Sequence, residues 1–142
     1  MASLNPYLNF NGNTEEAFNF YKSVFGNEFS SVMRWKDMPD SEKIPDTVRE
    51  KIMHISLPIG KETILMGTDR IEEFGQQVTA GTNFNINVST ESTAEADKIF
   101  NALAKGGKPT MPMENTFWGS YFGMLTDKFG IHWMVDTELK KG

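Results

Sequence analysis

Hydrophobic residues recur at helical spacing in two segments of the chain. The apolar positions of the first segment follow the i, i+3, i+4, i+7 pattern of an amphipathic helix and comprise Ala17, Phe20, Tyr21 and Val24. The second segment repeats this stripe 79 positions later, with Ala96, Ile99, Phe100 and Leu103. A stripe that recurs at one fixed offset indicates two copies of one supersecondary unit.

Start and stop signals bound both predicted helices. In each copy a short polar residue stands three positions before a glutamate, and a glycine follows the last apolar position: Asn13, Glu16 and Gly26, then Ser92, Glu95 and Gly106. The first two residues predict a cap in which each side chain bonds a free amide of the first turn. The glycine predicts a left-handed end.

Strand-like segments surround each predicted helix in the same order. One segment precedes each helix and three follow it: residues 7–10, 28–35, 51–59 and 63–68, then residues 84–88, 108–113, 120–126 and 131–135. The polar stretch 36–50 predicts a long loop with a helical turn after Pro45. The sequence therefore predicts an α+β fold of paired βαβββ modules, residues 1–70 and 81–139, within one domain of residues 1–142.

Strand alternation separates a core face from an open face, since successive side chains point to opposite sides of a sheet. In residues 84–88 the apolar side chains form the face that we expect to pack on the helix, while Asn83, Asn85 and Asn87 form the other. The same rule puts His54 on the open face of residues 51–59, together with Ile52 and Ser56. A polar open face favours a small-molecule site, and the alternative is a face covered by solvent or a second subunit.

Charge and composition narrow the classes of function. The chain has no cysteine, which excludes disulfides and cysteine-built zinc sites and is typical of a reducing compartment. Its 14 Lys and Arg residues are scattered and the net charge is −5, so nucleic-acid binding is not expected. No apolar run approaches the membrane-spanning length of about 20 residues. We therefore expect a cytoplasmic protein without a membrane partner.

Several motifs resemble one known family along nearly the whole chain. The first module carries Pro6 to Asn13 (PYLNFNGN), the middle region Ile64 to Asp69 (ILMGTD), and the last module Thr116 to Trp118 (TFW) followed by Thr126 to Gly130 (TDKFG) and Trp133. These motifs resemble PhnB-like proteins of the vicinal oxygen chelate superfamily, the glyoxalase and bleomycin-resistance relatives. The resemblance implies curved mixed sheets around a cavity and a homodimer.

The resemblance leaves the activity open, because the superfamily contains metal-dependent isomerases, lyases and dioxygenases as well as proteins that only bind a ligand. A demethylubiquinone methyltransferase label also occurs in the family. No glycine-rich loop follows a predicted strand and opens a helix here, so the sequence does not support a cofactor for methyl transfer. We expect no cofactor.

The family's metal ligands come from the first and last strands of each module. The matching positions hold Pro6 or Tyr7, Met66, Asn83 and Met134, and none is a histidine or carboxylate. A catalytic divalent ion needs about three nitrogen or oxygen ligands, so no metal is expected at this site. His54 and His132 could together build a different site.

The leading hypothesis is a protein that binds a small molecule in the sheet cavity without the usual metal. The candidate ligand-binding residues are Tyr7, Trp35, Ser56, Met66, Asn83, Asn85, Trp118 and Met134. His54 and Glu114 are the candidate catalytic residues of the alternative, a lyase, isomerase or dioxygenase, which in the superfamily is metal-dependent. A scaffold that uses its sheets only for dimerisation is the third reading.

Overall fold

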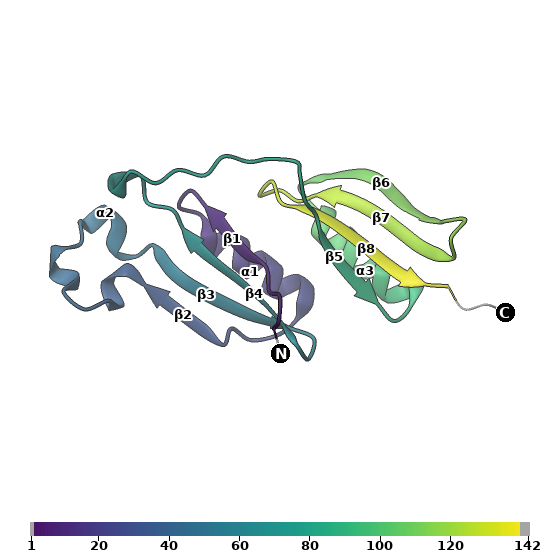
Figure 1. The fold of residues 1–142 in the computed structure, drawn as a ribbon, viewed down its shortest axis with the longest axis horizontal. Helices are drawn as coiled ribbons and strands as arrows, with labels where there is room; N and C mark the ends of the chain where they lie inside the picture. The colour runs from purple at the N-terminus through teal and green to yellow at the C-terminus, as the bar shows by residue number, and fades with distance from the viewer. Residues whose placement is uncertain (1, 140–142) are drawn as a thin grey trace. The chain divides into compact units, whose positions relative to one another are not determined.

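The computed structural model describes residues 2–139, which divide after Thr79 into two compact units, called unit 1 and unit 2 below. Each unit has one four-stranded sheet and one long helix (Figure 1). The predicted α+β fold with a βαβββ order of elements in each half is confirmed. None of the helices within residues 2–139 is long and apolar enough to cross a membrane.

Unit 1 contains sheet 1, in which the strands lie in the order β1-β4-β3-β2. Its elements are β1 (Tyr7–Phe10), α1 (Thr14–Phe25), β2 (Ser31–Arg34), η1 (Trp35–Asp37), η2 (Ser41–Lys43), α2 (Asp46–Arg49), β3 (Ile52–Ile59), β4 (Thr63–Asp69) and η3 (Glu72–Phe74). Strand β1 runs parallel to β4, and the other two pairs are antiparallel. The helical turn predicted after Pro45 is α2.

Unit 2 repeats this arrangement in sheet 2, with the strand order β5-β8-β7-β6. Its elements are β5 (Ile86–Thr90), α3 (Thr93–Ala104), β6 (Lys108–Asn115), β7 (Ser120–Thr126) and β8 (His132–Glu138). Helices α1 and α3 have 12 residues each and begin at Thr14 and Thr93, which are 79 positions apart. The internal repeat predicted from the hydrophobic stripes is therefore confirmed.

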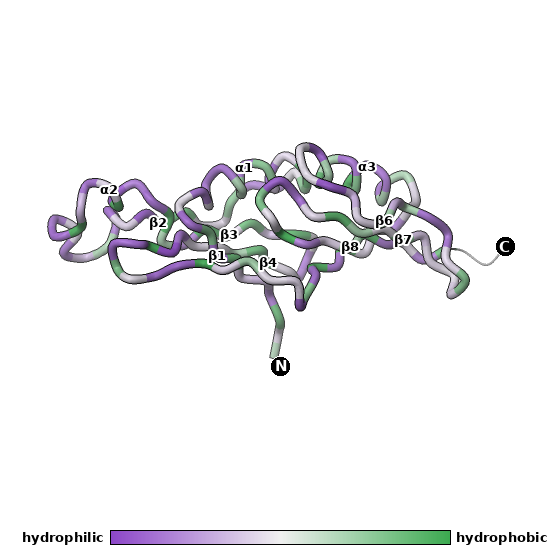
Figure 2. Tube along the Cα trace, turned by 90° about the horizontal axis from the view of Figure 1, so that it is seen from above, coloured by the Kyte–Doolittle hydropathy of each residue, from purple (hydrophilic) through white to green (hydrophobic). Residues whose placement is uncertain are grey.

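Glycines identify the face of each sheet that its helix covers. A Cβ atom on Gly67 in β4 would lie 2.5 Å from the Phe18 ring of α1, and one on Gly123 in β7 would lie 2.9 Å from the Phe100 ring of α3. The helices can approach this closely only because glycine has no side chain. Figure 2 shows each helix on one side of the strands of its own unit, so each sheet has a covered face and an open face.

The covered faces contain the cores. Leu8 and Ile55 pair with Gly67 and are buried, and Val135 pairs with Gly123 and is completely buried. Trp133 is 1% exposed and belongs to the core of unit 2. Burial of such side chains stabilises a domain by about 1.5–3 kcal/mol each.

The predicted cap of the first helix is wrong. Asn13 makes no side-chain cap hydrogen bond; instead, the Thr14 amide and hydroxyl donate to the buried Asp69 carboxylate at 3.0 and 2.6 Å. Asp69 also accepts from the Ile52 amide at 2.7 Å, so it connects α1, β3 and β4 rather than fixing a local turn. In α3 half of the predicted cap forms: Ser92 Oγ accepts from the Glu95 amide at 3.1 Å, while the Glu95 side chain accepts from the amide of Glu91, one residue before the cap.

Two predicted face assignments are also wrong. Alternation predicts Ile52 on the open face, but Ile52 is completely buried. The reason is a bulge in β3: Met33 pairs with His54 and the next residue of β2, Arg34, pairs with Ile52, so β3 has one extra residue at this point. Such a bulge reverses the alternation beyond it. Phe84 was placed in the core, but it precedes β5 and is 60% exposed.

Candidate functional site

The open face of sheet 1 brings together four of the predicted site residues. Tyr7 pairs with Met66 and Met66 pairs with Ser56, so their side chains form one row across β1, β4 and β3 on the side away from α1. The Tyr7 hydroxyl lies 3.1 Å from Nδ1 of His54. His54 therefore belongs to the same face, as predicted.

The contact with Tyr7 allows two hydrogen-bonding arrangements of His54, since either the Tyr7 hydroxyl or Nδ1 can be the donor. When Nδ1 accepts the phenol proton, the neutral imidazole carries its own proton on Nε2. No hydrogen-bond partner for Nε2 occurs among the described residues. The side chain is half-buried, so Nε2 is an available donor in this arrangement and an available acceptor in the other.

Trp35 lies in η1, directly after β2, and its ring packs edge-on against Phe74 with 5.4 Å between centroids. Its Nε1 is buried and has no hydrogen-bond partner among the described residues. The Trp35 ring is therefore already engaged in a packing contact within unit 1.

The open face of sheet 2 differs in chemistry. Met134 pairs with Asn87 and Met124, and Met124 pairs with Met111, which gives one row across all four strands. In the next row Phe122 of β7 pairs with Glu114 and with an aspartate of β8. The candidate acid Glu114 therefore belongs to this second row and is exposed on the edge strand β6.

Asn83 and Asn85 were assigned to this face by alternation, but β5 begins only at Ile86, so both residues precede the strand. The strand rule does not apply to them. Asn87, and not Asn83, pairs with Met134.

A hollow of about 580 Å³ lies at one end of the open face of sheet 2. Its lining includes Trp118, which is 60% exposed, and the carboxylates Asp136 and Glu138. Three residues that carry hydroxyl groups also belong to the lining: Ser89, Thr90 and Ser120. Neither carboxylate has an ion-pair partner among the described residues.

Of these three residues, the sequence analysis named Trp118 as a candidate but did not name Asp136 or Glu138. A signal was present, because both residues share the strand parity of Met134, which was correctly assigned to the open face. The predicted strand ended at residue 135, three residues before the observed end of β8 at Glu138. Alternation was therefore not extended to them.

The strand register shows which residues occupy the positions that hold the metal in the superfamily. Tyr7 pairs with Met66 in sheet 1, and Asn87 pairs with Met134 in sheet 2. A phenol, an amide and two thioethers do not match the nitrogen and carboxylate ligands that catalytic zinc or magnesium prefers. No group of three or more potential His, Asp or Glu ligands occurs within residues 2–139. The residues do not fit the superfamily's metal.

His132 has partners for both ring nitrogens. Nε2 lies 2.9 Å from the Gly81 carbonyl oxygen and therefore donates to it, and Nδ1 lies 2.9 Å from the Thr126 hydroxyl. A histidine held in this way fixes the start of β8. His132 thus has a structural role in unit 2.

Comparisons with known proteins agree with this architecture. A glyoxalase/bleomycin resistance protein/dioxygenase family enzyme from Burkholderia phytofirmans PsJN has the same fold, with a TM-score of 0.63, 19% identity and coverage of 94% of this chain and 97% of that one. The chain therefore has the glyoxalase/bleomycin resistance fold.

Sequence comparison is more specific. Residues 2–136 match the family described as 3-demethylubiquinone-9 3-methyltransferase. The chain belongs to this family, the PhnB-like branch of the vicinal oxygen chelate superfamily, as the motifs predicted. Protein YjdN of Escherichia coli K12 is 31% identical over 94% of this chain and 93% of its own length.

Two solved structures resemble the chain over almost its entire length. PA1353 from Pseudomonas aeruginosa is 37% identical, has a TM-score of 0.86, and is matched over 99% of this chain and 100% of that one. The PhnB protein from Bacillus cereus is 26% identical, with a TM-score of 0.77 and coverage of 96% and 99%.

Proposed function

We propose that this PhnB-like protein binds a small organic cation with a flat apolar part, without a metal ion, in the hollow of unit 2. One observation carries the proposal: the exposed indole of Trp118 and the carboxylates of Asp136 and Glu138 line the same hollow. The volume of about 580 Å³ lies within the range of small-molecule sites.

The chemistry of these groups favours a cation over an anion or a neutral molecule. The interaction between an indole face and a cation contributes about 0.5–1 kcal/mol at an exposed site and more when water is excluded. Two carboxylates, neither of them ion-paired within residues 2–139, add a favourable field for the same charge. An anion would be repelled by both carboxylates, so charge sign is the property that a binding experiment should vary.

Phenyltrimethylammonium and benzenesulfonate provide this comparison, because both have one benzene ring and opposite charges. We expect phenyltrimethylammonium to quench the fluorescence of Trp118 in a saturable way and benzenesulfonate to have no effect. Asp136→Asn should weaken binding at least threefold, and Trp118→Phe should remove the signal. Asp46→Asn, in unit 1, is the control. Equal responses to both compounds, or unchanged affinity in Asp136→Asn, would refute the proposal.

A second candidate is acid–base catalysis on the open face of sheet 1, in a lyase, isomerase or dioxygenase. The contact of 3.1 Å between Tyr7 and Nδ1 of His54 favours it, because a hydrogen-bonded imidazole with a free Nε2 can transfer a proton. His54→Ala should abolish any turnover found with lyase and isomerase substrates, and Tyr7→Phe should reduce it. Turnover that survives in His54→Ala would eliminate this mechanism.

We do not propose methyl transfer, although the family's description names it. A nucleotide-like methyl donor is typically held by a glycine-rich turn between a strand and a helix. In this chain residues 11–13 connect β1 to α1 and residues 91–92 connect β5 to α3. These two turns together contain one glycine, Gly12, so neither is glycine-rich.

We also propose that the protein is a cytoplasmic homodimer that uses the open face of sheet 1. Tyr7, Met33 and Ile64 are 45%, 38% and 37% exposed there, and apolar side chains on an open sheet face favour association. Sedimentation equilibrium should give the dimer mass in the micromolar range, and Ile64→Glu should shift the mass toward the monomer. A wild-type monomer across that range would be inconsistent with the proposal.

A further inference from the structure

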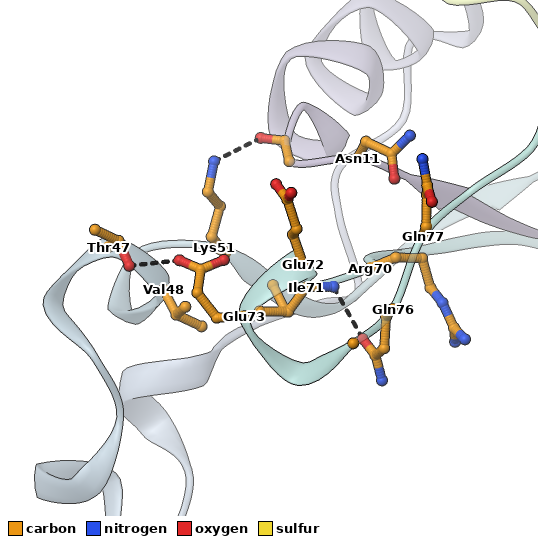
Figure 3. A pocket seen from close by; sticks show the side chains of 12 residues that line it. Asn11, Thr47, Val48, Lys51, Arg70, Ile71, Glu72, Glu73, Gln76 and Gln77 are labelled. Carbon is orange, nitrogen blue, oxygen red and sulfur yellow. Dashed lines mark hydrogen bonds between the residues drawn. The ribbon is translucent and has the colours of Figure 1, made fainter.

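A second hollow lies in unit 1, apart from the site proposed above, and has a volume of about 640 Å³. Four segments line it: the turn after β1, helix α2, the residue before β3, and the chain that follows β4 (Figure 3). Val48 and Ile71 form its apolar part, and both side chains are buried. These walls make the hollow a feature of unit 1 alone.

Charged side chains of both signs surround this hollow without neutralising one another. Lys51 and Arg70 supply two positive charges, and Glu72 and Glu73 supply two negative charges. None of the four takes part in an ion pair among the described residues, although Arg34, Lys36 and Lys22 elsewhere in unit 1 all do. Mixed charges left unpaired on one hollow are available to a ligand.

The local hydrogen bonds explain why the charges stay apart. Lys51 Nζ donates to the Gly12 carbonyl oxygen at 3.2 Å, and the Thr47 hydroxyl donates to Glu73 at 2.5 Å. The Thr47 hydroxyl, the amide of Glu73 itself and the charge of Lys51 lower the pKa of Glu73, in that order of size. Glu73 and Lys51 are thus each hydrogen-bonded to a neutral partner.

The hollow is also fixed by contacts that do not use these charges. The Asn11 side chain accepts from the Val78 amide at 2.9 Å and donates to the Val78 carbonyl oxygen at 3.3 Å. The Gln76 side chain accepts from the Ile71 amide at 2.9 Å. Together these bonds hold the segment that carries Glu72 against the turn after β1.

Figure 3 shows how the charged groups are disposed. The ends of Lys51 and Glu72 extend to the same side of the hollow, while Arg70 extends in another direction. An ammonium and a carboxylate that reach the same space without pairing match a ligand that carries both charges itself. Val48 and Ile71 are only 1% and 3% exposed, so the polar and charged residues supply most of the surface that a ligand contacts.

We propose that this hollow binds a short zwitterionic peptide or amino acid, whose carboxylate lies near Lys51 and whose ammonium lies near Glu72. The class follows from charge complementarity, because a ligand with a single charge would meet one matching and one opposing group. This inference does not depend on the function proposed above, since the two sites share no residue.

Glycyl-leucine is a suitable probe, because it is short and has both a free ammonium and a free carboxylate. N-acetyl-glycyl-leucine lacks the ammonium, and glycyl-leucinamide lacks the carboxylate. Titration of the ¹⁵N-labelled protein, observed by amide chemical shifts, detects binding even at a Kd of about 1 mM and locates it. We expect glycyl-leucine to shift amides of residues 47–51 and 70–77, and each blocked analogue to bind at least threefold more weakly.

Variants identify the groups responsible. Glu72→Gln and Lys51→Met should each weaken glycyl-leucine binding about threefold or more. Methionine is chosen because its unbranched side chain resembles the aliphatic stem of Lys51. Lys61→Met and Glu62→Gln, in the exposed turn between β3 and β4, are the matched controls and should leave the affinity unchanged. If Lys51→Met fails to fold, Glu72→Gln still decides the question, because Glu72 is exposed. Equal affinities for the three peptides, or the absence of shifts in these segments, would overturn the proposal.

Discussion

The buried carboxylate of Asp69 offers a sharp test of how unit 1 is held together. It is 2% exposed and accepts three hydrogen bonds, from the Thr14 amide, the Thr14 hydroxyl and the Ile52 amide. Asp69→Asn keeps the size of the side chain but replaces one acceptor oxygen with an NH₂ group. One of these donors then faces another donor.

The expected cost follows from the bonds that change. A hydrogen bond to a charged group contributes about 1.5–3 kcal/mol, and a buried donor without a partner costs about 1–3 kcal/mol. The surviving bonds also weaken, because the acceptor has lost its charge. We therefore expect Asp69→Asn to lower the free energy of unfolding by about 3–5 kcal/mol, which is a large fraction of the roughly 5–15 kcal/mol of a typical domain.

Urea unfolding followed by circular dichroism measures this loss. Asp46→Asn, an exposed aspartate in the first turn of α2, is the control and should change the stability by no more than about 0.5 kcal/mol. Thr14→Val removes the hydroxyl but keeps the amide, so its loss should be smaller than that of Asp69→Asn. A loss below about 1 kcal/mol in Asp69→Asn would show that the carboxylate does not hold α1 to the sheet.

Two further predictions concern the helix interface and the charged surface of unit 1. Gly67→Ala should lower the free energy of unfolding by about 1–3 kcal/mol, because its Cβ would overlap the Phe18 ring, while Gly81→Ala should be neutral; equal stabilities in urea would be inconsistent with this packing. The Arg34 hydrogen bond lowers the pKa of Glu15, burial opposes it, and the Arg34 charge lowers it further. The resulting stabilisation is present above the unfolded pKa near 4.5 and is lost as the pH falls through the lower folded pKa. Carboxyl NMR titration of Arg34→Met should show the pKa of Glu15 returning toward 4.5, and an unchanged pKa would contradict the assignment.

Local patterns were sufficient to predict the elements of the fold. Residues 7–10 and 120–126 were predicted with the bounds that β1 and β7 have, because polar or glycine-containing turns limit both strands. The stripe of α3 was also informative, since Ala96, Phe100 and Leu103 are buried. These features depend on neighbours within a few positions, which sequence periodicity reports directly.

Features that depend on distant partners could not be predicted in the same way. The first turn of α1 is bonded to Asp69, 55 positions away, so the local cap signal of Asn13 was misleading. The burial of Ile52 depends on a bulge in the pairing of β2 with β3, and neither strand alone reveals it. Sequence periodicity could not predict the hollow of unit 1 either, because its charged residues come from separate segments of the chain.

The methionines of sheet 2 favour an apolar ligand surface over a soft metal site. Met111, Met124 and Met134 are consecutive members of one row on strands β6, β7 and β8. Neighbouring strands are about 4.8 Å apart, so the backbones of the outer two methionines are about 10 Å apart, whereas ligands of one metal ion converge on a single point. A row of flexible thioether side chains instead forms a continuous, deformable apolar strip. Because Asp136 and Glu138 follow Met134 on the same face of β8, this strip continues into the hollow with the two carboxylates, an arrangement that complements a ligand with an apolar body and a cationic end.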